Sequence, residues 1–164
     1  MHERRFAGVI ALHGERVVLV RERRDSWGGE FWNIPSGRVE AHETPVLGAV
    51  RELAEETGLR VAPDGLRLVG TSSTTHGDSR SLAWNFTVTI DRPVLAVDDP
   101  DGSILEARWF PRGEAVDVLG RLPYRPLAEP VVAHLREEVA PGSHWIYDAA
   151  DAHPAVIAPT GTHP

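Results

Sequence analysis

Three glutamates, Glu52, Glu55 and Glu56, are spaced for joint chemistry within a segment that has the pattern of a helix. Positions i, i+3 and i+4 of a helix project within an arc of about 100°. Carboxylates on one face repel one another, and Mg²⁺ or Mn²⁺ compensates that repulsion because hard cations prefer carboxylate oxygen. Magnesium characteristically shares its shell among carboxylates, waters and substrate phosphates. The spacing therefore indicates a magnesium-dependent phosphate site.

An acidic helix face also has a simpler explanation, because such faces are commonly only solvated surface. The residues around the three glutamates favour the site. They form a longer pattern that ordinary residue usage would rarely produce by chance: Gly37, five residues, Glu43, seven residues, then Arg51-Glu52-Leu53-Ala54-Glu55-Glu56-Thr57-Gly58-Leu59.

The helix that must position these carboxylates has clear ends. Thr44 is a suitable N-cap, Pro45 suits the first helical position, and Gly58 supplies the stop. We therefore predict a helix from about Thr44 to Thr57. Its apolar residues centre on the side opposite the acids, so that the helix can dock on a sheet; they are Val46, Val50, Leu53 and Ala54.

The pattern from Gly37 to Leu59 resembles the signature of the Nudix hydrolase family at every position that the signature defines. The flanking segments, residues 32–35 and 106–110, are also similar, although Ser36 stands where many members have a glycine. The resemblance implies an α+β fold, an α/β/α sandwich with a mixed sheet. It also implies metal-dependent hydrolysis of a nucleoside diphosphate linked to another moiety, such as a nucleoside triphosphate or a nucleotide sugar. The alternative is a module of the same fold that senses a nucleotide without cleaving it.

For the metal, the resemblance implies four ligands. The side chains of Glu52, Glu55 and Glu56 would bind Mg²⁺, with Mn²⁺ as a possible substitute, and the backbone carbonyl of Gly37 would add a further ligand. The metal would neutralise the phosphate oxygens and lower the pKa of a coordinated water.

For catalysis, the resemblance implies that Arg51 and Glu43 form an orienting pair. The general base would be Glu52 or, as a second choice, Glu106. Trp27 is a separate inference from the residues themselves. It lies in a polar, glycine-containing stretch with no obvious core partner, which makes it a candidate to stack on a nucleobase.

The remaining elements fit one domain. Residues 6–12 and 17–20 read as a hairpin, and apolar residues alternate from Leu82 to Ile90 in a strand with one buried face. Asp98, Asp99 and Asp101 read as turn residues without chemistry. We expect a Nudix hydrolase domain over residues 1–140 and a loosely ordered tail over residues 141–164.

Composition limits the other possibilities. The chain has no cysteine and no lysine, which excludes thiolate nucleophiles and lysine Schiff bases, and a reducing cytoplasm suits it. The net charge of -7 argues against non-specific nucleic-acid binding, and no apolar run is long enough to span a membrane. The expected partner is a small-molecule diphosphate, and the oligomeric state stays open.

Overall fold

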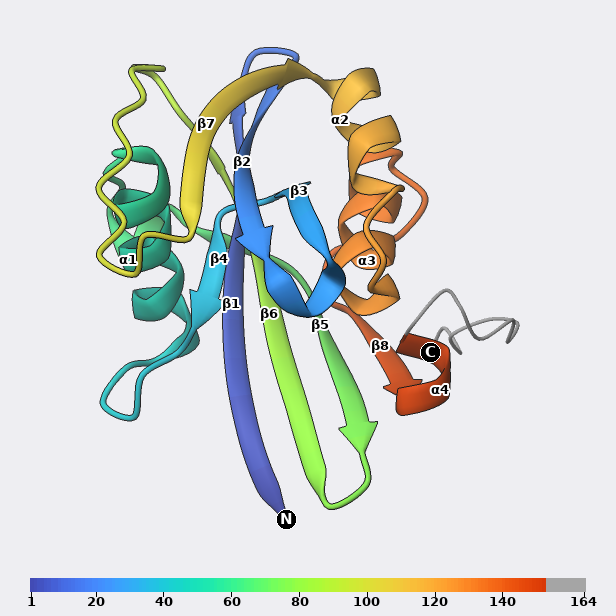
Figure 1. The fold of residues 1–164 in the computed structure, drawn as a ribbon. Helices are drawn as coiled ribbons and strands as arrows, with labels where there is room; N and C mark the ends of the chain where they lie inside the picture. Colours follow the sequence, from blue (N-terminus) through green and yellow to red (C-terminus); the bar gives the residue numbers. More distant parts are fainter. Residues whose placement is uncertain (153–164) are drawn as a thin grey trace.

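A twisted sheet with helices on both sides makes up the molecule (Figure 1). The structure, a computed structural model, describes residues 1–152 of the 164-residue chain. The strands are β1 (His2–His13), β2 (Arg16–Arg24), β3 (Gly29–Asn33), β4 (Ser36–Arg38), β5 (Arg67–His76), β6 (Ser79–Thr89), β7 (Ile104–Pro111) and β8 (Ser143–Asp148). The helices are α1 (Pro45–Thr57), α2 (Arg112–Leu119), α3 (Arg125–Leu135) and α4 (Ala149–Ala152), with short 3₁₀ turns η1 (Asp25–Trp27) and η2 (Pro63–Gly65).

The sheet is mixed, as predicted. Its main path runs β3-β2-β1-β6-β5-β8, while β4 pairs with β1 and β7 pairs with β2. The β1–β6 and β5–β8 pairs are parallel, and the other pairs are antiparallel. Helix α1 covers one face, and α2 and α3 cover the other (Figure 1), which confirms the α/β/α sandwich.

Local chemistry explains the elements that the sequence predicts best. The hairpin turns at Gly14, whose φ of 57° suits glycine, and Leu12 pairs with Val17. At the start of α1, the Thr44 Oγ1 accepts a hydrogen bond from the Leu47 N–H at 3.3 Å. At its end, Gly58 adopts φ 77° and donates its N–H to the Ala54 carbonyl. The predicted hairpin and helix are both confirmed.

Two apolar clusters hold the layers together. Leu53 and Ala49 of α1 are fully buried against strand residues such as Val9 and Val18. On the other face, Val131 and its neighbours in α2 and α3 pack on residues such as Leu19. The predicted buried face of β6 lies on the α1 side, where Phe86, Val88 and Ile90 are buried and Trp84 packs against them.

The expectation of a loosely ordered tail from residue 141 is wrong for Ser143–Asp148. This segment forms β8 and pairs in parallel with β5. Trp145 and Tyr147 alternate into a buried position, and the Tyr147 hydroxyl donates to the Glu129 Oε2 at 2.9 Å. Only two large residues carry the alternation, so the surrounding Pro, Ala and His residues obscure it. Residues 153–164 lie outside the described part, and a domain boundary at residue 140 stays a prediction.

Among residues 1–152, no helix is long and apolar enough to cross a membrane.

Candidate functional site

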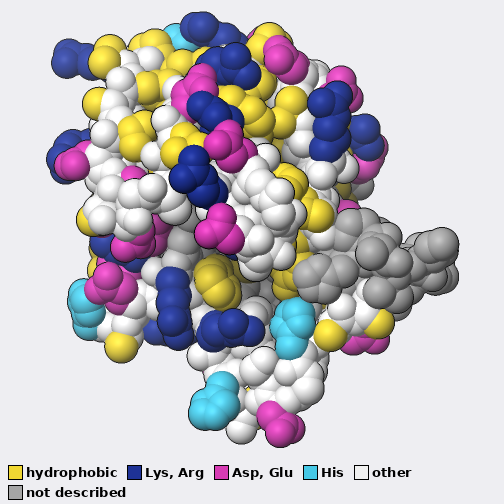
Figure 2. Space-filling model, viewed as in Figure 1, with side chains coloured by type: hydrophobic (Ala, Val, Ile, Leu, Met, Phe, Trp, Pro, Cys, Tyr) yellow, Lys and Arg dark blue, Asp and Glu magenta, His cyan; other side chains and the backbone are white. Residues whose placement is uncertain are grey.

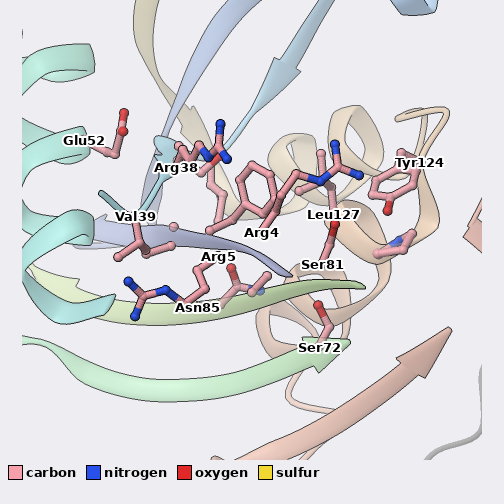
Figure 3. Close-up of a pocket in the computed structure, with 18 of the residues that line it drawn as sticks. Arg4, Arg5, Arg38, Val39, Glu52, Ser72, Ser81, Asn85, Tyr124 and Leu127 are labelled. Carbon is pink, nitrogen blue, oxygen red and sulfur yellow. The ribbon is translucent and has the colours of Figure 1, made fainter. Parts of the chain in front are cut away.

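A cavity of about 1010 Å³ lies over the face of β1, β5 and β6. Glu52 and Glu56 of α1 line one end of it, together with Gly37. The other end is lined by the beginning of β1, the ends of β5 and β6 and the segment before α3. Figure 3 shows these two ends, with Glu52 on one side and Tyr124 on the other. The cavity is therefore polar at both ends but built from different elements at each.

Gly37 lets the carboxylate of Glu52 approach the backbone of β4. A Cβ atom added at Gly37 would overlap the carboxyl group of Glu52, so that any other residue would displace it. The side chain of Glu52 is only 12% exposed, and burial raises its pKa although Arg51 acts in the opposite direction. The structure therefore brings Gly37 and Glu52 together, as the sequence pattern requires.

Glu56 is the most buried acid of the site. Its residue is 5% exposed, and its Oε2 accepts a hydrogen bond from the Ser36 N–H at 2.9 Å. Burial raises the pKa of Glu56 to about 9, and the negative charges of Glu52, Glu22 and Asp99 act in the same direction. A carboxyl group in this position holds its proton at neutral pH unless a cation stabilises the ionised form.

Arg51 and Glu43 form the predicted pair. The Arg51 Nε donates to the Glu43 Oε1 at 2.7 Å, and Nη2 donates to the Glu43 Oε2 at 3.0 Å. This bidentate contact lowers the pKa of Glu43 and raises that of Arg51. Nη1 of Arg51 also reaches Glu52 at 2.8 Å and Glu55 at 3.2 Å. One guanidinium thus fixes the orientation of three carboxylates.

Glu55 lies at the margin of the site. Its side chain is 29% exposed, its Oε2 is bonded to Arg51, and it does not line the cavity. Glu55 therefore differs from Glu52 and Glu56, which both line the cavity. The three carboxylates share one helix face, but only two of them face the cavity.

A loop that crosses the end of α1 brings further acids to the site. The Ala96 N–H donates to the Thr57 carbonyl and the Asp98 N–H to the Glu55 carbonyl, both at 2.8 Å. Asp99 and Asp101 follow and line the cavity. The Asp99 carboxylate closes the loop because it accepts from the N–H groups of Asp101, Ser103 and Ile104; these contacts measure 3.1, 2.8 and 3.0 Å.

The donor set at this end of the cavity fits a hard divalent cation. It consists of the buried carboxylate of Glu56 and the largely buried one of Glu52, beside the backbone of Gly37, which carries no side chain. Burial and the negative charge of Glu52 both raise the pKa of Glu56. A cation would supply the missing positive charge. A separate group of potential ligands, the carboxylates of Glu40 and Glu43 and the imidazole of His42, also lies close together. It fits less well, since Glu43 is bonded to Arg51 and the other two side chains are exposed.

A family model described as the NUDIX domain matches residues 1–135 of the chain. The chain belongs to the NUDIX domain family.

Individual relatives show how far the likeness extends. The 8-oxo-dGDP phosphatase NUDT18 of Homo sapiens is 31% identical over 108 residues, which cover 63% of this chain and 31% of the relative. The RNA pyrophosphohydrolase of Zymomonas mobilis is 42% identical over 52 residues, which cover 32% of this chain and 33% of the relative. The chain therefore spans about a third of the length of each of these two relatives.

The fold of a solved structure is also similar. A mutator MutT protein from Bacillus halodurans superposes with a TM-score of 0.68 at 20% sequence identity, over 98% of this chain and 97% of that one. The likeness agrees with the mixed sheet and the helices on its two faces.

Two residues predicted from the sequence lie away from the acidic end. Trp27 lines the cavity but at a distance along it from α1, where it packs against Phe31 and Tyr124. Glu106 does not line the cavity. Its Oε2 accepts from the Arg21 Nε at 3.3 Å, and its side chain is 40% exposed. The structure therefore does not bring Glu106 to Glu52 and Glu56.

Three acids of the site were not predicted. Glu22 is buried in β2, pairs with Arg24 at 2.6 Å and lines the cavity, while Asp99 and Asp101 enter from the loop. The sequence shows Asp99 and Asp101 only as turn residues. For Glu22 a signal existed, because a buried strand that continues into an acid is uncommon unless that acid has a partner.

Proposed function

We propose that this NUDIX domain hydrolyses the phosphoanhydride of a nucleoside diphosphate linked to another moiety, with Mg²⁺ or Mn²⁺ as the required metal. The nucleotide sugars and nucleoside triphosphates both belong to this class. The observation that carries the proposal is the buried carboxylate of Glu56 and the largely buried carboxylate of Glu52, which lie beside the bare backbone of Gly37 at one end of the cavity.

The proposed metal ligands are the side chains of Glu52 and Glu56, the carbonyl of Gly37 and, from the margin, Glu55. When bound, the metal would neutralise phosphate oxygens and lower the pKa of a coordinated water. The side chains of the protein would bind the substrate and position the reacting groups. Arg38 lines the cavity next to this end and has no carboxylate partner among residues 1–152, so that its guanidinium is suited to bind a diphosphate oxygen.

Glu52 is the proposed general base. One of its oxygens accepts from Arg51 at 2.8 Å, which fixes the carboxylate while it faces the cavity. Arg51 and Glu43 would act as positioning residues. Glu106 is a weaker choice because Arg21 holds it outside the cavity.

The test is a phosphate and nucleotide release assay on the purified chain with a panel of nucleoside triphosphates and nucleotide sugars. We expect turnover that requires Mg²⁺ or Mn²⁺ and stops in EDTA. Metal-dependent binding of a nucleotide without turnover of any compound would contradict the proposal and favour the sensing module. The control variant is Glu138→Gln, which changes an exposed glutamate. Glu22→Gln is unsuitable as a control because Glu22 pairs with Arg24.

A further inference from the structure

The end of the cavity opposite the carboxylates is basic rather than acidic. Arg4 and Arg24 both line it, together with the hydroxyl-bearing residues Ser81 and Thr74. Figure 3 shows the side chain of Arg4 extended toward Tyr124, while Glu52 lies on the far side of the view. In Figure 2, arginine side chains lie next to one another and beside a histidine in the lower part of the same face.

Strand register explains why Arg4 and these polar groups share one surface. In the parallel β1–β6 pair Arg4 is opposite Ser81, and in the antiparallel β5–β6 pair Ser81 is opposite Thr74. Side chains at paired positions of a sheet point to the same face. The three residues therefore form one row across the sheet under the cavity.

The same register gives the separation between the two ends. Ser36, whose N–H binds Glu56, is opposite Gly8 of β1. Arg4 is four residues earlier on that strand, which corresponds to about 13 Å at the usual strand rise. The Arg4 side chain extends from this point toward Tyr124, away from Glu52. A group attached to a diphosphate at the acidic end must therefore extend along the cavity to reach Arg4.

Arg4 has the charge to bind an anion. It has no carboxylate partner among residues 1–152, whereas Arg24 donates from Nε to Glu22 at 2.6 Å. The guanidinium of Arg24 is also held in place, since its central carbon is 4.4 Å from the centroid of the Trp27 ring. Arg4 is therefore the principal cation of this end, and Arg24 a fixed second one.

Tyr124 completes the surface. Its ring is 6.0 Å from that of Trp27 and 6.4 Å from that of His76, and its hydroxyl is 3.2 Å from the His76 Nε2. Burial raises the pKa of this hydroxyl, and a hydrogen bond with Thr74 and the charges of Arg4 and Arg24 act in the opposite direction. Arg4, Arg24 and Tyr124 thus line the same end of the cavity.

We propose that Arg4, assisted by Arg24 and the Tyr124 hydroxyl, binds a second anionic group on one of the two groups that the diphosphate links. This inference rests on the proposed function and narrows its substrate class. The preferred substrates are diphosphate compounds in which one of the two linked groups carries a phosphate monoester. Compounds without the monoester bind more weakly, because only the monoester forms a charge-assisted hydrogen bond with the Arg4 guanidinium.

The test compares two pairs of diphosphate compounds that differ by one phosphate monoester: NADP⁺ against NAD⁺, and coenzyme A against dephospho-coenzyme A. Dissociation constants are measured by calorimetry in EDTA, so that binding is separated from metal-dependent turnover. We expect the phosphorylated member of at least one pair to bind about tenfold more tightly to the wild-type chain. The preference should fall to about twofold or less in Arg4→Gln and persist in part in Arg4→Lys.

The matched control is Arg80→Gln. Arg80 is the residue before Ser81 in β6, so that its side chain points to the opposite face, and it does not line the cavity. The preference should be unchanged in this variant. An equal preference in wild type and Arg4→Gln would overturn the proposal, and so would equal affinity for both members of both pairs. Inorganic phosphate that binds as tightly as NADP⁺ would also overturn it, because the site would then bind a free anion.

A release assay in Mg²⁺ on the same four compounds keeps the two proposals apart. Preference in EDTA without any turnover would contradict the hydrolytic function and leave the anion subsite standing. Turnover without any preference for the phosphorylated compounds would support the hydrolytic function and contradict the anion subsite.

Discussion

The two ends of the cavity were built in different ways. The acidic end depends mainly on one helix and the strand before it, and its key groups lie within the short stretch from Gly37 to Glu56. The basic end is assembled from the first residues of β1, the turn η1, two more strands and Tyr124 before α3. A short stretch of sequence can specify the chemistry at one end, whereas only the complete fold specifies what the other end recognises.

The largest effect is expected from Glu56→Gln at the acidic end. The change removes a charge at nearly constant volume, and glutamine can still accept from the Ser36 N–H. If the end holds a metal, the turnover number should fall by about a thousandfold or more, because metal stabilisation of the transition state amounts to several kcal/mol. Steady-state kinetics in Mg²⁺ measure it, with circular dichroism to check the fold. Wild-type turnover would remove Glu56 from the metal site.

Gly37→Ala should have the next largest effect. The added methyl group overlaps the Glu52 carboxyl group, which must then move away from the β4 backbone. A displacement of about 1 Å at a catalytic group can cost about a hundredfold in rate. The control is Gly29→Ala, where a Cβ atom meets nothing within 4 Å. Similar rates for both variants would show that the close approach at Gly37 has no catalytic importance.

Arg51→Ala should be less severe. Arg51 is a positioning residue, because its hydrogen bonds orient the carboxylates of Glu43, Glu52 and Glu55. Residues of this kind typically contribute about tenfold to a hundredfold. We expect that fall in the turnover number with little change in KM. A change confined to KM would instead assign Arg51 to substrate binding.

These residues also show what the sequence could predict. The helix α1 and its ends follow from capping residues and from spacing within one segment, so that local rules suffice. The Arg51–Glu43 pair was implied by the resemblance of that segment to the Nudix family. Glu22 and Asp99 reach the site through strand pairing and a loop that crosses α1, and neither contact is visible in local spacing. The strand β8 was missed for a similar reason, because its position beside β5 depends on a long-range pairing.

Trp27→Leu tests the basic end. Trp27 lines the cavity beside Tyr124, with the Arg24 guanidinium over its ring, and we expect a planar base to contact the part of the ring that faces the cavity. Loss of stacking should raise KM about tenfold with little change in the turnover number. Trp27→Phe retains an aromatic face and should recover most of the affinity. Equal KM values for Trp27→Leu and wild type, with every nucleotide that is turned over, would exclude Trp27 from substrate binding.

The smallest effect concerns the stability of the metal-free protein. The pKa of Glu56 is about 9, well above the ordinary value of 4.5, so the folded state binds more protons than the unfolded state between these pH values. The free energy of unfolding therefore decreases as pH rises from 4.5 toward 9. In EDTA, Glu56→Gln should melt roughly 5 °C higher than wild type near the upper end of that window and show a weaker pH dependence. Thermal scans across pH measure both, and parallel curves for the two proteins would contradict the burial argument.

Uptake of Mn²⁺ by the purified chain, followed by electron paramagnetic resonance, tests the central claim most directly. The account predicts that wild type binds Mn²⁺, that Mg²⁺ displaces it, and that Glu56→Gln loses most of the affinity while Glu138→Gln retains it. Wild-type protein that takes up no Mn²⁺, even with a nucleotide sugar or nucleoside triphosphate present, would contradict the account, and so would equal uptake by Glu56→Gln.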